Sequence, residues 1–507
     1  MSASREKKKR QELLSNGGVD PKAARAAEQQ AAEKKAKILY TTLAVVFVVV
    51  AVFLVVYNSG ILQRSRTAVT IDGEKYSVAD VSYYYGAAYQ NFINSYGSYA
   101  SLFGLDTTKS LKSQGAWGGE DQTWDEYFKD QAVENMKFVH AALKSAAEDG
   151  MTLSDEDMES FNANVEQIKA QASNAGYSYK SYLNAIYGSV MTPSVYEENL
   201  KDNLLASKYA TAHHDEISFT DDEVQSFYEE NKNSYDLVDG AYVSVSGTPA
   251  AKTDEEGNTV EATDEEKADA MKAAKEAAEA ILAAYEDGGD LEKLAEEHGG
   301  IYTGSETLTY SSGVSGDWLF DSSRKAGDAE VLEDESGSRY YVAVFNGRQR
   351  DEAPGYNVRH ILVTEDNLEL GEGEEATDEM IAAKAQEILD SWDGTEDGFA
   401  ALANEYSQDD GSNTNGGLYE DVAKGTMVTN FNNWCYEDGR KAGDTGIVSS
   451  TYGQHIMYFV GYSDDHTLDA WYYNCNNKMI SDAYSEWQTE MTASVTAEVQ
   501  SGMNSVG

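Results

Sequence analysis

The sequence predicts an α+β protein with several domains, and three observations lead to this prediction. The chain has 507 residues, more than a single hydrophobic core usually organises. Residues 38–57 form a run of uncharged, mostly apolar residues. Helical patterns fill residues 67–237, and the following part combines strands and helices in motifs that occur twice. We therefore expect one transmembrane helix, a helical domain, two tandem domains and a C-terminal helix.

The first element is a basic tail followed by an apolar segment. Residues 1–37 contain ten Lys or Arg, whereas only Arg64 and Arg66 follow closely on the far side of residues 38–57. The positive-inside rule therefore places the N-terminus in the cytoplasm and the bulk of the chain outside it. A cleaved signal peptide has a shorter charged start and an apolar core of about 7–15 residues. We interpret 38–57 as an uncleaved helix that contacts the lipid bilayer.

The charge of the remaining chain is strongly acidic. Residues 1–66 hold 12 basic and 5 acidic side chains, which leaves 27 basic and 83 acidic side chains beyond them. Such a charge repels nucleic acid and anionic lipid, so we expect no nucleic-acid partner. A solvated acidic surface explains the charge without a specific cation site. The two cysteines, Cys435 and Cys475, give no disulfide framework.

Residues 67–237 begin with a hairpin and continue as helices. Residues 69–78 read as two short strands around an Asp-Gly turn. A helix is expected over 124–147, and further helices begin after Ser154, Thr192 and Thr220, each a favoured N-cap. Residues 466–507 are expected to form an amphipathic helix, because apolar residues recur there at spacings of three and four. The members of this stripe are Trp471, Cys475, Met479, Tyr484, Trp487, Met491 and Val495.

The middle of the chain contains an internal repeat. Residues 318–328 (WLFDSSRKAGD) align without a gap on 434–444 (WCYEDGRKAGD). Residues 261–264 (EATD), which precede a helical pattern, recur at 375–378. A repeat of about a hundred residues indicates a duplicated domain rather than a solenoid. We place the two domains at 238–350 and 355–462.

The second repeat carries three motifs in order: VRHILV at 358–363, YSQD at 406–409 and YGQHI at 452–456. This order resembles the parvulin family of peptidyl-prolyl isomerases. The resemblance implies a four-stranded antiparallel sheet with helices, and rotation about X-Pro bonds without a metal or cofactor. The hairpin and helices of 67–237 resemble the N-terminal chaperone region of the PrsA and SurA foldases. In those proteins a C-terminal helix packs onto this region, so we expect 67–237 and 466–507 to form one composite domain.

The resemblance also implies a set of site residues in the second repeat. His360 and His455 match the paired histidines that face each other beneath the site, and Asp409 matches the position that is Cys or Asp in the family. Three residues match the slot for the proline ring: Leu418, Met427 and Phe431. Tyr452 matches the position before the second histidine. The usual Gly-Gly-Asp-Leu-Gly is here GGLYE at 416–420, and the acidic loop after the first strand disfavours a phosphoserine before proline.

The first repeat lacks these residues. The alignment puts Val243 at the place of His360 and Arg339 at the place of His455. The loop that carries Asp409 is shortened to residues 298–301. We therefore expect 238–350 to keep the fold without activity and to serve as a spacer or a peptide-binding surface.

The functional hypothesis is a membrane-anchored extracytoplasmic foldase, at the surface of a Gram-positive bacterium, that isomerises X-Pro bonds. Its partners would be unfolded or secreted polypeptides that contain proline. The alternative is a non-catalytic holdase or scaffold that binds unfolded peptides. The abundant tyrosines, 34 against 14 phenylalanines, suit core packing or client contact. The segment HHDE at 213–216 is not expected to bind a metal, because adjacent side chains on a helix diverge.

Overall fold

The computed structural model describes residues 7–8 and 66–507, apart from 120, 255–257 and 372–374. The transmembrane segment predicted at 38–57, and nearly all of the tail predicted at 1–37, lie outside the described residues. Within the described part, no helix combines the length and apolarity needed to cross a membrane. The chain divides into two compact units, one ending at Ile217 and completed by Ala483–Gly507, the other formed by Ser218–Asp482.

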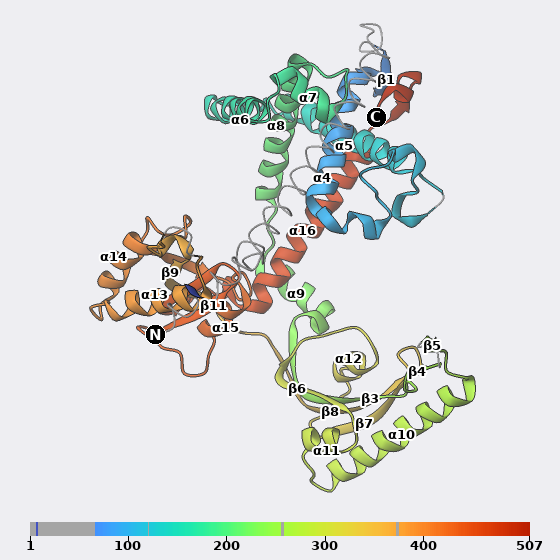
Figure 1. Ribbon diagram of the computed structural model, residues 1–507, viewed down its shortest axis with the longest axis vertical. Coiled ribbons are helices and arrows are strands. Elements are labelled where there is room, and N and C mark those ends of the chain that lie inside the picture. The colour runs from blue at the N-terminus through green and yellow to red at the C-terminus, as the bar shows by residue number, and fades with distance from the viewer. Residues whose placement is uncertain (1–6, 9–65, 120, 255–257, 372–374) are drawn as a thin grey trace. The chain divides into compact units, whose positions relative to one another are not determined.

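The first unit contains a small sheet that joins the two ends of the described chain. Strands β1 (Thr67–Ile71) and β2 (Glu74–Ser77) form the predicted hairpin around an Asp-Gly turn. Strand β13 (Ala497–Val499) pairs with the other edge of β1, so that Val69 lies opposite Val499. Figure 1 shows the C-terminus beside β1. Strands near the two ends of the described stretch 66–507 therefore belong to one sheet.

Helices make up the rest of the first unit. The helices are α4 (Val78–Tyr96), α5 (Trp124–Glu148), α6 (Asp155–Asn174), α7 (Tyr179–Tyr187) and α8 (Pro193–Glu216). The expected N-caps Ser154 and Thr192 each accept a hydrogen bond from a backbone N–H of the first turn. Short 3₁₀ segments between α4 and α5 lie at Gly97–Phe103, Leu111–Ser113 and Ala116–Gly118. An apolar core joins the sheet to α4, α5, α7 and α8, and it includes Val506 near the end of the chain.

The second unit begins with helix α9 (Asp221–Asn231), a 3₁₀ turn (Lys232–Ser234) and a four-stranded antiparallel sheet. The strands of this sheet are β3 (Asp236–Ser246), β6 (Ile301–Leu308), β7 (Asp328–Asp334) and β8 (Arg339–Arg350). Its helices are α10 (Asp264–Glu286), α11 (Leu291–Glu297) and α12 (Val314–Leu319). A separate two-stranded ribbon consists of β4 (Lys252–Thr253) and β5 (Thr259–Val260). We call the segment from β3 to β8 the first sheet module.

A second sheet module follows with the same order of elements. Its strands are β9 (Tyr356–Val363), β10 (Leu418–Val422), β11 (Thr445–Ser450) and β12 (Gly453–Tyr462). Its helices are α13 (Asp378–Asp390), α14 (Glu396–Tyr406) and α15 (Thr429–Cys435), with a 3₁₀ turn at Glu365–Asn367. The strand order is β10-β9-β12-β11, which matches β6-β3-β8-β7 in the first module, element by element.

The two faces of the second sheet pack against different helices. Ile361, Val363 and Ile456 pack with residues of α13 and α14. Val358 and Met457, which occupy alternate positions on the same strands, pack with residues of α15. This alternation follows from the two-residue period of a strand. We call the surface on the α15 side of this sheet the α15 face.

The C-terminal helix is shorter than the sequence suggested. After a 3₁₀ turn at His466–Leu468, helix α16 runs over Ala470–Ala493, whereas 466–507 was expected to be helical. The segment after α16 is rich in Ser, Thr and Val, which have low helix propensity, and it forms β13 and a 3₁₀ turn at Ser501–Ser505. Apolar residues of α16 pack in two separate hydrophobic clusters. Trp471 and Cys475 pack with α9 in the second unit, and Met491 packs in the core of the first.

Candidate active site

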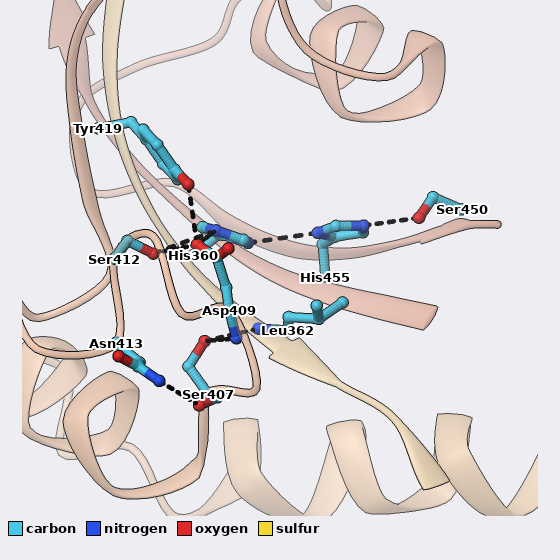
Figure 2. Close-up of polar contacts among 9 residues, drawn as sticks. All are labelled: His360, Leu362, Ser407, Asp409, Ser412, Asn413, Tyr419, Ser450 and His455. Atoms are coloured by element: carbon cyan, nitrogen blue, oxygen red, sulfur yellow. Dashed lines mark hydrogen bonds and ion pairs between the residues drawn. The ribbon is translucent and has the colours of Figure 1, made fainter. Parts of the chain in front are cut away.

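Two neighbouring strands bring His360 and His455 together. On β9, His360 lies opposite Met457 of β12, while His455 of β12 lies opposite Leu362, so both imidazoles emerge on the α15 face. Their Nδ1 atoms are 3.2 Å apart, and the rings are nearly parallel with centroids 5.4 Å apart. Both residues are buried, with 4% and 5% of their surface exposed. Figure 2 shows the two rings aligned across the sheet.

Asp409 lies on the other side of His360. It follows α14 in the connection to β10, and its Oδ2 atom lies 2.9 Å from Nε2 of His360. The hydroxyls of Tyr419 and Ser412 also donate hydrogen bonds to Oδ2, the former over 2.9 Å. The hydrogen bond from His360 is the main cause that holds the pKa of Asp409 far below its ordinary value, against an opposing effect of burial. Asp409 is therefore an ionised, acceptor-only group.

The charge on Asp409 fixes the tautomers of both histidines. Because the carboxylate accepts, Nε2 of His360 carries its proton, and Nδ1 of a neutral His360 is an acceptor. Nδ1 of His455 must then donate to His360, which leaves Nε2 of His455 to accept a hydrogen bond from the Ser450 hydroxyl at 2.7 Å. Burial, followed by repulsion from His360, lowers the pKa of His455 to about 4. Hydrogen bonds therefore run in one direction from Ser450 to Asp409, along the contacts drawn as dashed lines in Figure 2.

Phe431 forms the apolar side of the site. Its ring, on α15, is 2% exposed and stands nearly perpendicular to both imidazoles, with centroids 5.3 Å from His360 and 5.5 Å from His455. Met427 is half-buried and packs against the same apolar cluster as Phe431. Helix α15 begins only at Thr429, so Met427 lies in the loop before it.

The structure corrects the expectation for Leu418. Leu418 lies opposite Arg359 on β9, and Arg359 bonds Glu396 of α14, so Leu418 belongs to the opposite face from His360. The next residue, Tyr419, lies opposite Val358 and occupies the α15 face. The register is therefore shifted by one residue relative to the expectation. Tyr419 takes the place that was expected for a leucine.

Tyr452 lies at the edge of the site. It occupies the turn between β11 and β12, and 66% of its surface is exposed. Its backbone N–H donates to the Ser450 hydroxyl over 3.1 Å, which orients the serine that bonds His455. Its side chain is not part of the apolar cluster around Phe431.

The sequence did not lead us to predict three polar residues of the site: Ser412, Tyr419 and Ser450. Ser412 follows Asp409 by three residues, a spacing at which a hydroxyl reaches the carboxylate in a turn, and this signal was available. Tyr419 was not predicted because its position on the α15 face was assigned to Leu418. Ser450 ends a strand next to a turn and has no local signal, because its partner His455 is reached only through the β11–β12 pairing.

The first module has tyrosines at the two histidine positions. The N–H of Gly327 donates to Phe345, as that of Gly443 donates to Phe459, which makes Phe345 and Phe459 equivalent. Tyr341 stands four residues before Phe345, as His455 stands four before Phe459. Ala343 stands two residues before Phe345, as Met457 stands two before Phe459. Tyr242 lies opposite Ala343, so it corresponds to His360, which lies opposite Met457.

The assignment of Val243 and Arg339 to the histidine positions was therefore wrong by one and two residues. The error at Arg339 arises because the β7–β8 hairpin has a longer turn than the β11–β12 hairpin. The rings of Tyr242 and Tyr341 meet edge to face, with centroids 5.7 Å apart. As expected, neither position holds a histidine. Only residues 298–300 connect α11 to β6, so no counterpart of the Asp409 loop is present.

Chemically, the site places a fixed negative charge and a directed hydrogen-bond chain beside an apolar ring. Among the described residues, no group of three or more His, Cys, Asp or Glu side chains is arranged to hold a metal ion. Such a surface suits a reaction that redistributes charge within a bound neutral group. Neither histidine is placed as an exposed nucleophile, because both are buried.

Comparison with known proteins identifies two regions of the chain. Residues 341–460 match the family model of the PPIC-type PPIase domain, and residues 29–210 match that of the SurA-like N-terminal domain. Foldase protein PrsA 1 of Listeria innocua is 33% identical over 137 residues, which cover 27% of this chain and 38% of the relative. Foldase protein PrsA 1 of Listeria monocytogenes is 31% identical over 180 residues, which cover 35% of this chain and 51% of the relative.

The chain thus spans about half or less of the length of these relatives. Among solved structures, foldase protein PrsA from Streptococcus pneumoniae aligns with 75% of this chain and 85% of its own, at 12% identity and a TM-score of 0.29. The match to the two family models is local and specific to separate regions.

Proposed function

We propose that this chain, whose residues 341–460 belong to the PPIC-type parvulin isomerases and whose residues 29–210 belong to the SurA-like N-terminal domains, is a foldase. In this proposal the second sheet module catalyses cis/trans isomerisation of X-Pro bonds. The first unit binds unfolded segments of the same clients as a chaperone. The clients are unfolded or secreted polypeptides that contain proline.

One observation carries the catalytic proposal: the hydrogen-bond chain from Ser450 to Asp409 runs beside the ring of Phe431. Rotation of an X-Pro bond has a barrier of about 18–20 kcal/mol, which reflects amide resonance. Catalysis requires a site that binds the twisted amide better than the planar one. In the twisted amide the proline nitrogen is pyramidal and the carbonyl carbon loses electron density from nitrogen.

The proposed roles follow from this chemistry. Phe431 and Met427 hold the proline ring, and the Asp409 carboxylate acts electrostatically on the carbonyl of the twisted amide. His360 and His455 keep Asp409 ionised and in place, and they transfer no proton. Because the reaction breaks no covalent bond, these residues are sufficient in principle without a nucleophile or an added group.

The first sheet module is proposed to be a degenerate parvulin-like domain over residues 238–350. Its shared strand order and the Tyr242–Tyr341 pair support this reading. Without a carboxylate loop and without histidines at the two paired positions, the module has no means of polarising an amide in this way. It contributes spacing or peptide contact to the foldase.

The location proposed for the protein is the outer face of a cell membrane, on a Gram-positive bacterial surface. The basic tail 1–37 stays in the cytoplasm and residues 38–57 cross the lipid bilayer, so that the folded units face outward. The acidic charge of the chain beyond residue 66 favours cationic client segments and repels anionic lipid headgroups.

The test is an X-Pro peptide isomerisation assay on the full chain in detergent, with His455→Ala and Asp409→Ala beside it. We expect acceleration over the uncatalysed rate, lowered at least about tenfold by either substitution. His466→Ala, in an exposed histidine of the same unit, is the matched control and keeps the activity.

A second assay separates the holdase alternative. Suppression of the aggregation of a denatured client is measured with the same variants. A chain that suppresses aggregation but never accelerates isomerisation, at any pH between 5 and 8, would establish the holdase and overturn the catalytic proposal.

A further inference from the structure

Tyr419 occupies a position where the resemblance leads one to expect a leucine of the proline slot. It lies on β10 opposite Val358 and packs in the apolar cluster of the α15 face together with Phe431. Its ring is tilted by 35° to that of His360, with centroids 5.5 Å apart. Unlike leucine, it also brings a hydroxyl into the site. Figure 2 shows this hydroxyl directed at Asp409.

The hydroxyl completes an asymmetric arrangement around the carboxylate. His360, Ser412 and Tyr419 all donate to Oδ2 of Asp409. Within the described part of the chain, no hydrogen-bond donor reaches Oδ1. A carboxylate with three donors on one oxygen cannot turn without losing them, so its orientation is fixed. The free oxygen of Asp409 remains for a substrate.

The three donors differ in origin. Ser412 belongs to the same loop as Asp409 and moves with it, whereas His360 is on β9 and Tyr419 is on β10. Tyr419 and His360 therefore hold the loop from two adjacent strands of the sheet. Burial, and then its contact with Asp409, raises the pKa of Tyr419, so the phenol stays protonated and remains a donor.

We propose that Tyr419 is a positioning residue of the isomerase site: its hydroxyl fixes the Asp409 carboxylate with Oδ1 presented to the substrate, while its ring forms the wall of the proline slot. This inference rests on the proposed isomerase function. Tyr419 differs from the leucine of the family pattern because its hydroxyl bonds Asp409 while its ring packs in the apolar cluster. A leucine at this position would keep the wall and leave the carboxylate with two donors.

The two parts of the residue can be removed separately. Tyr419→Phe deletes the hydroxyl and keeps the ring, and Tyr419→Leu deletes the hydroxyl and keeps an apolar wall. In the full chain, both variants are expected to lower kcat for an X-Pro peptide about fivefold, with KM changed less than about twofold. Tyr458→Phe is the matched control, because Tyr458 is on β12 of the same sheet and packs on the opposite face.

A double-mutant cycle distinguishes positioning from a general effect on folding. In the Asp409→Asn background the charged acceptor is gone, so adding Tyr419→Phe should lower kcat no further than about 1.5-fold. The melting temperature of each variant is measured beside its kinetics. An equal loss of kcat from Tyr419→Phe in both backgrounds, or no loss in either, overturns the proposal.

The outcome is separable from that of the proposed function. A wild-type chain that accelerates isomerisation, is disabled by His455→Ala and is indifferent to Tyr419→Phe keeps the isomerase and refutes the role of Tyr419. A wild-type chain without any acceleration refutes both.

Discussion

Nδ1 of His455 donates to Nδ1 of His360 across 3.2 Å, in a pair that is closed on one side by Ser450 and on the other by Asp409. This single contact determines which ring nitrogens carry protons. With both rings neutral, one nitrogen of the facing pair donates and the other accepts. Burial disfavours a charge on His455 and lowers its pKa to about 4, and this property sets the behaviour of the site with pH.

The first prediction concerns stability against acid. The folded pKa of His455 is about 4, below the ordinary value of 6.5, so between these values the unfolded chain binds more protons than the folded chain. The free energy of unfolding therefore falls as the pH is lowered from 6.5 to 4, by about 1 kcal/mol per pH unit from this residue. Asp409 acts in the same direction at lower pH, because its folded pKa is also depressed.

Urea unfolding of the second unit at pH 7, 5.5 and 4.5 measures this slope. The variant His455→Gln has no ionisable group at this position and should lose less stability over the same range. Equal slopes for the two chains would contradict the assignment of a buried, neutral His455.

The second prediction compares the same substitution on the two faces of the second sheet, the α15 face and the face that packs against α13 and α14. Phe431→Leu should lower kcat/KM about tenfold, because the ring beside both histidines is lost. Phe399→Leu makes the same substitution in the core beneath α14, where Phe399 is 0% exposed. It should cost a similar amount of stability, about 1–2 kcal/mol, and leave kcat/KM within about twofold.

Isomerisation kinetics and urea midpoints of both variants give the two quantities. Similar losses of kcat/KM in Phe431→Leu and Phe399→Leu would show that activity simply follows stability, against a specific role of Phe431.

The third prediction concerns the first sheet module. Tyr341→Ala removes one member of the tyrosine pair that stands at the histidine positions. Because this module lacks a carboxylate loop, kcat/KM for an X-Pro peptide should stay within about twofold of the unmodified chain. His455→Ala in the same assay provides the scale of a catalytic loss. A fall for Tyr341→Ala as large as for His455→Ala would place activity in the first module as well.

The fourth prediction concerns the C-terminal strand. Removal of residues 495–507 deletes β13 and takes Val495, Met503 and Val506 out of the core of the first unit. Amide hydrogen exchange in β1 and β2 should become much faster, since β1 loses one of its two neighbours. Isomerase activity should stay within about twofold, because the site lies in the other unit.

Val499→Thr is the control for this truncation, because the Val499 side chain is 64% exposed and the backbone pairing is kept. Exchange in β1 that is unchanged by the truncation would show that the hairpin is stable without β13.

Much of this architecture was accessible from the sequence. Caps such as Ser154 and Thr192 give local signals that depend on a few adjacent residues, and helices begin where they indicate. His360 and His455 are 95 residues apart, and they were connected through a family pattern rather than through local chemistry. The structure brings them together, with Asp409 and Phe431, by pairing β9 with β12.

The errors share a physical origin. Leu418 instead of Tyr419, and Val243 instead of Tyr242, are one-residue shifts, and a shift by one moves a side chain to the opposite face of a strand. Both sheets contain register irregularities, between Tyr419 and Val422 in the second and between Asp239 and Gly240 in the first. A bulge is decided by pairing with a distant strand, so the local sequence carries little information about it.

The pairing of β1 with β13 has a consequence for biosynthesis. Ribosomes make β1 first among the strands and β13 last, and every residue of the second unit is made between them. The edge of β1 that pairs with β13 therefore has no partner strand until residues 497–499 have been made. A protein proposed to assist the folding of others thus completes its own first unit only after its second unit has been synthesised.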